Sequence, residues 1–258
     1  MRNRLTDELA VCGLNAVFAV GEYHPLTINR LFLREDRLKL FTGICKQLAE
    51  RKRPYKICDD EELERICKSV HHQGVVAMIE EPVVESLNMD DLALWADEAK
   101  VGVLLHSVGN DHNLGAIARA AAFFDVSFIV LNENCLSDDE VRLTTSAYRI
   151  AEGGFEHLTV RKISNTAAFL KDASKKLITI GTDIRARQRI SDLSGIIKNA
   201  NSGSRPGIVL VLGNEETGLP KDVKDRCSHL LRIPGTGNIE SLNVSQAAAL
   251  FLHVIFEL

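Results

Sequence analysis

Three short segments combine glycine with polar side chains, a pairing that suits close contact between a ligand and the main chain. They are residues 110–119, 213–220 and 235–243. Glycine permits that approach because it lacks a side chain, while Asn, Ser and Glu can orient hydroxyl or amino groups. Each segment alone is equally compatible with an ordinary turn before a helix, with Asn113 or Ser241 as the capping residue.

Other common chemistries lack their signatures in this sequence. There is no G-x-x-x-x-G-K-[ST] phosphate loop, no G-x-G-x-x-G fingerprint after the first candidate strand, no serine elbow and no paired-histidine metal site. The six cysteines are scattered without a C-x-x-C pair, which indicates neither a zinc site nor a disulfide framework. Hydrolase chemistry and a bound metal are therefore not expected.

Each segment follows an apolar run that is typical of a strand buried on both faces. These runs are residues 101–105, 208–212 and 230–233, and further strands are predicted at 127–131 and 177–180. Helix-like segments at 114–124 and 244–256 alternate with them, which predicts an α/β fold with a mostly parallel sheet. Because ligands bind at the carboxyl ends of such strands, we expect the three segments to form one composite pocket.

The first third of the chain predicts a separate, small α/β domain. Strands are expected at 28–33, 55–58 and 75–79, and helices at 37–50 and 60–68. The pattern weakens from 83 to 99, which we interpret as a linker with one short helix. The predicted organisation is a first domain at 1–82, this linker, and a second domain at 100–258.

Composition and charge are those of an ordinary globular protein. The 258 residues are 45% apolar and 26% charged, with a net charge of −4, which argues against nucleic-acid binding over the whole surface but allows a local basic patch. Basic residues cluster at 51–53 and 185–189, a pattern that most often marks solvated loops. No apolar run has transmembrane length and no signal core follows Met1, so a cytoplasmic location without membrane contact is expected.

The three segments resemble the three motifs of the SpoU family, the TrmH group of RNA ribose methyltransferases. The first motif, Asn-x-Gly-x-x-x-Arg, is matched by Asn113, Gly115 and Arg119. The second, Gly-x-Glu-x-x-Gly-Leu, is matched by Gly213, Glu215, Gly218 and Leu219. The third, Ile-Pro followed by Ser-Leu-Asn, is matched by Ile233, Pro234, Ser241, Leu242 and Asn243.

The resemblance covers nearly the whole chain. Residues 15–17 and 72–77 are similar to the family's N-terminal substrate-binding domain, which has an L30e-like, ribosomal-protein-like fold. The segment 151–157 resembles the family's Gly-Ala-x-Glu-His segment. Its sequence Glu-Gly-Gly-x-Glu-His, together with Gly-Thr-Gly-Asn at 235–238, looks most similar to the YfiF-type subgroup. Gly235 departs from the family, which usually has Met there, and Ala151-Glu-Gly153 departs from its Ser-x-Gly.

The resemblance implies a C-terminal trefoil-knotted (SPOUT) catalytic domain, S-adenosylmethionine as cofactor, and tRNA or rRNA as substrate. It also implies a homodimer, with which the apolar C-terminal helix agrees. The residues implied to hold the cofactor are Gly213, Gly218, Ile233, Pro234 and Leu242. Those implied to arrange catalysis are Asn113, Arg119, Glu215, Ser241 and Asn243. Because a guanidinium stays protonated, we expect Arg119 to stabilise developing negative charge instead of acting as a base.

Two alternatives remain open from the sequence. A non-catalytic RNA-binding paralogue could keep this fold, although the complete motif set favours an enzyme. A nicotinamide-dependent oxidoreductase is disfavoured by the missing dinucleotide fingerprint. His72 and Gln73 either contact RNA or form a packing turn before a strand, and His71 is expected at the surface.

Overall fold

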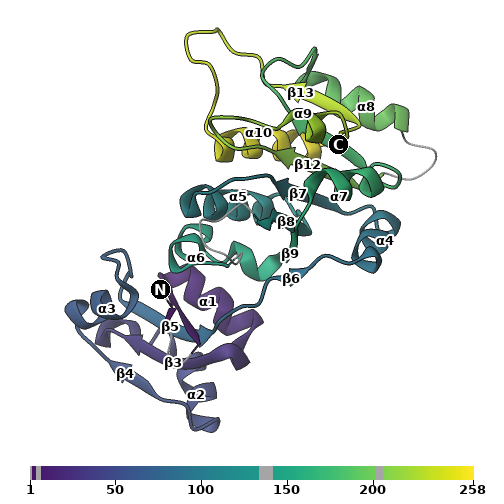
Figure 1. The fold of residues 1–258 in the computed structure, drawn as a ribbon. Coiled ribbons are helices and arrows are strands. Elements are labelled where there is room, and N and C mark those ends of the chain that lie inside the picture. The colour runs from purple at the N-terminus through teal and green to yellow at the C-terminus, as the bar shows by residue number, and fades with distance from the viewer. Residues whose placement is uncertain (1, 4–6, 134–141, 201–205) are drawn as a thin grey trace. The chain divides into compact units, whose positions relative to one another are not determined.

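The computed structural model describes residues 2–3, 7–133, 142–200 and 206–258, and it divides into two compact units (Figure 1). Unit 1 joins Met1–Val83 to Arg142–His157, and unit 2 joins Val84–Val141 to Leu158–Leu258. The predicted boundaries at 82 and 99 stay a prediction about separable domains. Cys135 lies outside the described residues.

Unit 1 is built on a five-stranded sheet in the order β1-β2-β5-β3-β4. Its central strand β5 (Val75–Glu80) pairs antiparallel with both β2 (Glu8–Cys12) and β3 (Ile28–Leu33). The edges are β1 (Arg2–Asn3), antiparallel to β2, and β4 (Tyr55–Ile57), parallel to β3. Three of these strands lie where the apolar runs predicted them, whereas β2 was not anticipated.

Helices cover both faces of this sheet. Cys58 joins Leu63 and Cys67 of α3 (Asp60–Cys67) in packing on the face formed by Ala10, Cys12, Val76 and Met78. The remaining helices are α1 (Leu14–Tyr23), α2 (Thr42–Glu50) and α6 (Thr145–Ala151). Phe18 of α1 stacks on Phe41, just before α2, with ring centroids 4.3 Å apart.

Segment 142–157 belongs to unit 1 because its contacts are made there. Asn15 donates to Glu152 at 3.0 Å, and the Nε2 atom of His24 lies 3.2 Å from Glu156. Arg142 forms an ion pair with Glu81 at 3.4 Å. The part of the chain that resembles the family's Glu-His segment therefore lies against α1 and its neighbours.

Unit 2 contains an eight-stranded sheet in the order β11-β13-β10-β12-β7-β8-β9-β6, and every described strand pair in it is parallel. The strands are β6 (Glu85–Ser86), β7 (Val101–Leu105), β8 (Phe128–Asn132), β9 (Thr159–Ile163), β10 (Ile178–Thr182), β11 (Gln188–Arg189), β12 (Ile208–Leu212) and β13 (His229–Arg232). All five residues of β12 are buried, as its uninterrupted apolar run predicted. The parallel α/β fold is confirmed.

Two helical layers enclose this sheet (Figure 1). One contains α4 (Met89–Asp97), α7 (Thr166–Ala173) and α9 (Lys221–Lys224), whose apolar side chains share a core with β7, β8 and β12. In the other, α10 (Val244–Phe256) contacts α5 (Asp111–Phe123) and α8 (Leu193–Ala200). Within the region expected to be a linker, Trp95 of α4 stacks on Phe128 at 3.6 Å, so this region contributes to the core of unit 2.

No helix among the described residues is both long enough and apolar enough to cross a membrane.

Candidate functional site

The three glycine-bearing segments lie at one edge of the parallel sheet of unit 2. Segment 110–119 forms the start of the helix that follows β7, segment 213–220 follows β12, and segment 235–243 follows β13. The sheet order β13-β10-β12-β7 places these strands close together, and parallel strands present their carboxyl ends at the same edge. The topology thus fulfils the geometric condition for a composite site.

Side-chain hydrogen bonds join all three segments. Asn113 donates from Nδ2 to Oε1 of Glu215, and Asn243 donates from its own Nδ2 to Oδ1 of Asn113 at 3.0 Å. Asn113 is the middle member and is buried, with 8% of its surface exposed. Because a buried amide is costly to leave unpaired, these two bonds fix its orientation and tie the segments together.

The helices begin at residues other than those expected. Asn110, and not Asn113, caps α5 by accepting from the backbone N–H of His112 at 2.8 Å. Asn243, and not Ser241, caps α10 by accepting from the backbone N–H of Ser245, also at 2.8 Å. The side chain of Asn113, three residues inside α5, is therefore available to bond across to the other two segments.

The second segment is closed by a tight backbone contact. A Cβ atom at Gly213 would lie 2.5 Å from the carbonyl carbon of Gly218 and 2.6 Å from the amide nitrogen of Leu219. Asn214 pairs with Gly218 in an isolated bridge and donates to the carbonyl of Ser107, two residues after β7, at 3.0 Å. Glycine is therefore required at 213 because any side chain there would collide with the backbone of Gly218 and Leu219. Glu215, at the turn, is exposed.

The third segment leaves its main chain open to solvent. Pro234 and Ser241 are exposed, Leu242 is 48% exposed, and Ile233 is partly buried. A Cβ atom on Gly235 or Gly237 would meet nothing within 4 Å. The segment therefore offers accessible backbone and apolar side chains to a ligand, and its own packing gives no reason for glycine at 235.

Arg119 lies on the same helix as Asn113. It is six residues beyond Asn113 on α5, so it leaves the helix about 120° around the axis and about 9 Å further along it. Arg119 is exposed, whereas Asn113 is buried. The described hydrogen bonds thus bring together Asn113, Glu215 and Asn243, and Arg119 lies further along the helix that carries Asn113.

A second polar group at the same sheet edge was missed by sequence reasoning. His106, which follows β7, lies with Nδ1 2.9 Å from the hydroxyl of Thr166, and Asn132 donates to that hydroxyl at 3.1 Å. Burial lowers the pKa of His106, and the nearby Asp222 only partly opposes this. Its neutral imidazole is therefore favoured, and no local motif marked these three separate residues as neighbours.

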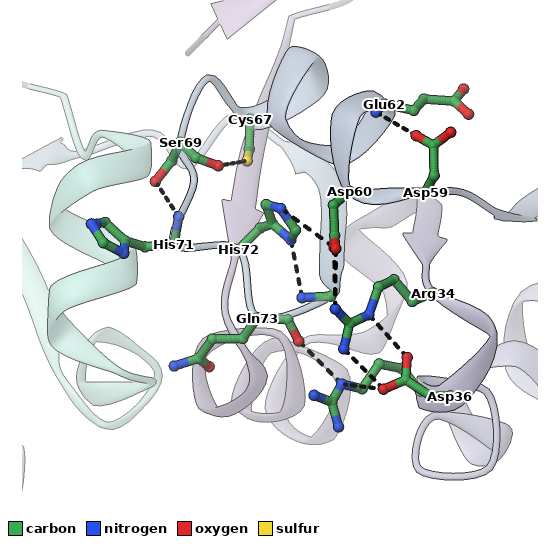
Figure 2. A network of polar contacts seen from close by, with 12 residues as sticks. Arg34, Asp36, Asp59, Asp60, Glu62, Cys67, Ser69, His71, His72 and Gln73 are labelled. Carbon is green, nitrogen blue, oxygen red and sulfur yellow. Dashed lines mark hydrogen bonds and ion pairs between the residues drawn. The ribbon is translucent and has the colours of Figure 1, made fainter.

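In unit 1, the segment expected to contact RNA or form a turn has well-defined structural contacts. Figure 2 shows His72 directed toward Asp60 and toward the main chain at Gly74, whose N–H it accepts at 3.0 Å through Nδ1. His72 is 4% exposed, which favours the packing interpretation for this residue. Gln73 accepts from the backbone N–H of Leu14 at 2.8 Å, and His71 is exposed as expected.

The two units match two protein-family models. Residues 100–253 match the SpoU rRNA Methylase family, and residues 10–83 match the family described as RNA 2′-O ribose methyltransferase substrate binding. The first match alone covers more than half of the chain.

Individual relatives extend over nearly the full length. The chain is 29% identical to the uncharacterized tRNA/rRNA methyltransferase YfiF of Escherichia coli O157:H7, across 98% of this chain and 69% of that protein. It is 28% identical to the 23S rRNA (guanosine-2′-O-)-methyltransferase RlmB of Bordetella pertussis, across 94% of each. Among solved structures, the SpoU methyltransferase AviRb of Streptomyces viridochromogenes, in complex with AdoMet, superposes with a TM-score of 0.73 at 20% identity, covering 100% of this chain and 93% of AviRb.

Proposed function

The chain belongs to the SpoU rRNA methylase family, and on that premise we propose that it transfers a methyl group from S-adenosylmethionine to a ribose 2′-hydroxyl of tRNA or rRNA. The observation that carries this proposal is the hydrogen-bonded group Asn113, Glu215 and Asn243, which joins the three family motifs at one sheet edge. These motifs are separated by up to 130 residues, so their meeting is a property of the fold.

The third segment fits the proposed cofactor. When bound, S-adenosylmethionine supplies an electrophilic methyl group on a positively charged sulfur. Exposed backbone around Ile233, Pro234 and Leu242 can hydrogen-bond an adenosine, and the exposed apolar side chain of Leu242 can cover its base. Gly213 and Gly218 shape the neighbouring turn of the second segment.

The polar residues then have the task of placing and activating the hydroxyl. Asn113 holds Glu215 and Asn243 in fixed positions, and we assign Ser241 to the same site. Arg119 stabilises negative charge that develops on the 2′ oxygen, while the proton leaves to a phosphate or to water. Positioning of this kind lowers a barrier by several kcal/mol in well-aligned sites.

We propose a homodimer formed through the exposed apolar side chains of α5 and α10. Phe123 is 78% exposed, Leu250 43% and Phe256 52%, and the Phe256 ring lies 5.9 Å from that of Phe124. Arg119 precedes Phe123 by four residues and shares its helix face, so this dimer would place Arg119 at the subunit boundary. Sedimentation equilibrium of a Leu250→Lys/Phe256→Lys variant tests this, with Leu94→Lys, at a leucine of α4 that is 52% exposed, as control.

We also propose that the protein works in the cytoplasm. All five described cysteines are free thiols, as a reducing compartment favours, and tRNA and rRNA are available there. The trefoil knot implied by the family resemblance stays a prediction.

The deciding experiment has two readouts on the wild-type protein. Calorimetric titration measures S-adenosylmethionine binding, and incubation with methyl-labelled cofactor and total tRNA or rRNA measures transfer. Mapping of 2′-O-methylated riboses in RNA from cells with and without the gene then identifies the target. Cofactor binding together with label in ribose supports the proposal.

A protein that binds RNA but shows no cofactor binding at millimolar concentration would instead be a non-catalytic paralogue. Gly235 is the departure that makes this second function worth testing, because it stands where the family usually has Met. Label recovered in mononucleotides after alkaline hydrolysis, instead of in alkali-resistant dinucleotides, would contradict ribose methylation, because a 2′-O-methyl group blocks cleavage of the adjacent phosphodiester.

A further inference from the structure

Four arginines gather at the same sheet edge as the three motifs but belong to none of them. Arg185, Arg187 and Arg189 follow β10, and Arg232 ends β13, and we call these four residues the arginine cluster. In the sheet, β10 lies between β12 and β13, the strands that carry the second and third motifs. The loop that holds the first three arginines therefore emerges between two motif segments.

The local structure presents these arginines to solvent. Asp183 turns the chain by accepting from the N–H groups of Arg185, at 2.8 Å, and Ala186, at 3.0 Å. The chain then pairs again with β13 through Gln188 and Arg189. Arg185, Arg187 and Arg189 are all exposed.

Two members of the arginine cluster lie where their positive charges repel each other unless an anion binds beside them. Arg189 and Arg232 are direct partners in the parallel pairing of β11 with β13, so their side chains leave the same face of strands roughly 4.8 Å apart. Like charges at directly paired positions are destabilising. In addition, Nε of Arg232 is buried and has no hydrogen-bond partner among the described residues.

Nearby carboxylates are already engaged. Asp183 forms an ion pair with Lys224 at 2.7 Å, and Asp192 accepts from the backbone N–H of Arg189 at 2.8 Å. Within the described ranges, no ion pair joins a member of the arginine cluster to a carboxylate at 4.0 Å or less. The guanidinium groups of the arginine cluster are therefore available to bind an anion at this edge of the sheet, although the net charge of the protein is −4.

We propose that the arginine cluster binds phosphodiester groups of the RNA strand beside the nucleotide to be methylated. This rests on the proposed function and adds a backbone-binding site to it. Planar guanidinium groups bind phosphate oxygens bidentately, and those of Arg185, Arg187 and Arg189 are exposed to such an anion. Phosphate contacts fix the register of a nucleic acid, which is what a ribose hydroxyl needs in order to meet a methyl donor.

The test compares two triple variants of the full-length protein. Arg185→Gln/Arg187→Gln/Arg189→Gln removes the exposed part of the cluster. Lys171→Gln/Lys175→Gln/Lys176→Gln is the matched control, because these exposed lysines precede β10 and lie at its amino end. Each variant removes three positive charges, so each takes the net charge from −4 to −7. Binding to labelled total tRNA and rRNA fragments is measured across a salt series, with inorganic phosphate as competitor.

We expect the arginine variant to bind RNA roughly tenfold or more weakly at low salt, and its log–log salt slope to fall by about 2. The lysine control should keep the wild-type slope, and S-adenosylmethionine affinity should be unchanged in both. Equal losses in the two variants, or no loss in the arginine variant, would overturn the proposal. Binding of inorganic phosphate with no preference for RNA would also overturn it.

A single variant separates phosphate binding from a structural role. Arg232→Lys keeps the charge but removes the planar guanidinium group, so RNA affinity should fall while the melting temperature of the free protein does not. A lower melting temperature with unchanged RNA affinity would count against the proposal. If the wild type methylates RNA but the arginine variants keep the wild-type RNA affinity, the proposed function stands and only the arginine site is wrong. If the wild type binds no RNA, both fail.

Discussion

Asn243 donates a hydrogen bond from Nδ2 to Oδ1 of Asn113 at 3.0 Å, and the same side chain caps α10 by accepting from the N–H of Ser245 at 2.8 Å. One amide therefore starts the last helix and ties it to a helix 130 residues earlier. Because Asn113 also donates to Glu215, the position of Asn243 determines the geometry of the whole candidate site.

These two roles of Asn243 can be separated by substitution. Asn243→Asp keeps the oxygen that caps α10 but loses the donor to Asn113, whereas Asn243→Ala loses both. We expect Asn243→Asp to lose about 1 kcal/mol of stability, because Oδ1 of the buried Asn113 is left without its donor, and to bind S-adenosylmethionine roughly tenfold more weakly. Asn243→Ala should in addition lose about 1 kcal/mol of stability from the missing cap.

Thermal unfolding and calorimetric titration of the two variants provide the comparison. If Asn243→Asp bound the cofactor as tightly as the wild type, the link to Asn113 would have no part in shaping the cofactor site. Equal melting temperatures for the two variants would argue against the capping role.

Gly213 and Gly235 offer a matched pair of glycines with opposite surroundings. Gly213→Ala should destabilise unit 2 by about 1–3 kcal/mol, because the new methyl group would lie 2.5–2.8 Å from backbone atoms that cannot move aside easily. Gly235→Ala should leave stability unchanged, since its methyl group would meet nothing within 4 Å. Denaturant unfolding of both variants checks this, and equal stabilities would refute the steric argument.

Gly235 also allows a gain of function to be tested. Gly235→Met introduces the residue usual in the family, at a position with free space and no positive φ. The fold should accept it, and tighter S-adenosylmethionine binding is expected if an apolar side chain there covers the cofactor. Unchanged affinity would show that the departure at 235 has no bearing on cofactor binding.

The strands were predictable from sequence, but the details of the site were not. An uninterrupted apolar run such as 208–212 has few alternatives to a strand buried on both faces, and β12 has those bounds. Helix starts depend on φ and ψ at a single residue, and both candidate loops contain more than one possible capping side chain. The sequence could not distinguish between these candidates, and the predicted caps Asn113 and Ser241 were wrong. The structure has Asn110 and Asn243 as the capping residues.

Long-range relationships were beyond pattern reasoning for a different reason. Stacking of Trp95 on Phe128 and the pairing of Arg189 with Arg232 depend on strand order and register, which no local spacing encodes. The arginines at 185–189 consequently had the pattern of an ordinary solvated loop. Only the position of β10 between β12 and β13 makes them neighbours of the motifs.

Arg119 provides a direct test of charge stabilisation. Arg119→Lys keeps the charge but removes the planar group, so we expect the rate of methyl transfer to fall about a hundredfold with unchanged S-adenosylmethionine affinity. Arg226→Lys, an exposed arginine after α9, is the control. Single-turnover kinetics with calorimetry would measure both effects, and a near-native rate for Arg119→Lys would exclude a need for the guanidinium.

Glu156 should make the stability of unit 1 depend on pH. Burial raises the pKa of this carboxyl from 4.5 to about 7, and the side chain is 5% exposed. The folded state therefore holds the proton more tightly than the unfolded state, so stability is greatest below pH 4.5 and declines as the pH rises toward 7. The full decline corresponds to about 3 kcal/mol.

Glu156→Gln removes this titration, because the amide is neutral at every pH. The variant should match the wild type near pH 4 and be more stable at pH 8, with the difference developing between pH 4.5 and 7. His24→Gln is the control, since it removes the neighbour at 3.2 Å while leaving the carboxyl buried. Calorimetric melting of the three proteins from pH 4 to 8 measures the effect. A pH-independent difference would mean that the pKa of Glu156 is ordinary, and the burial argument would then be wrong.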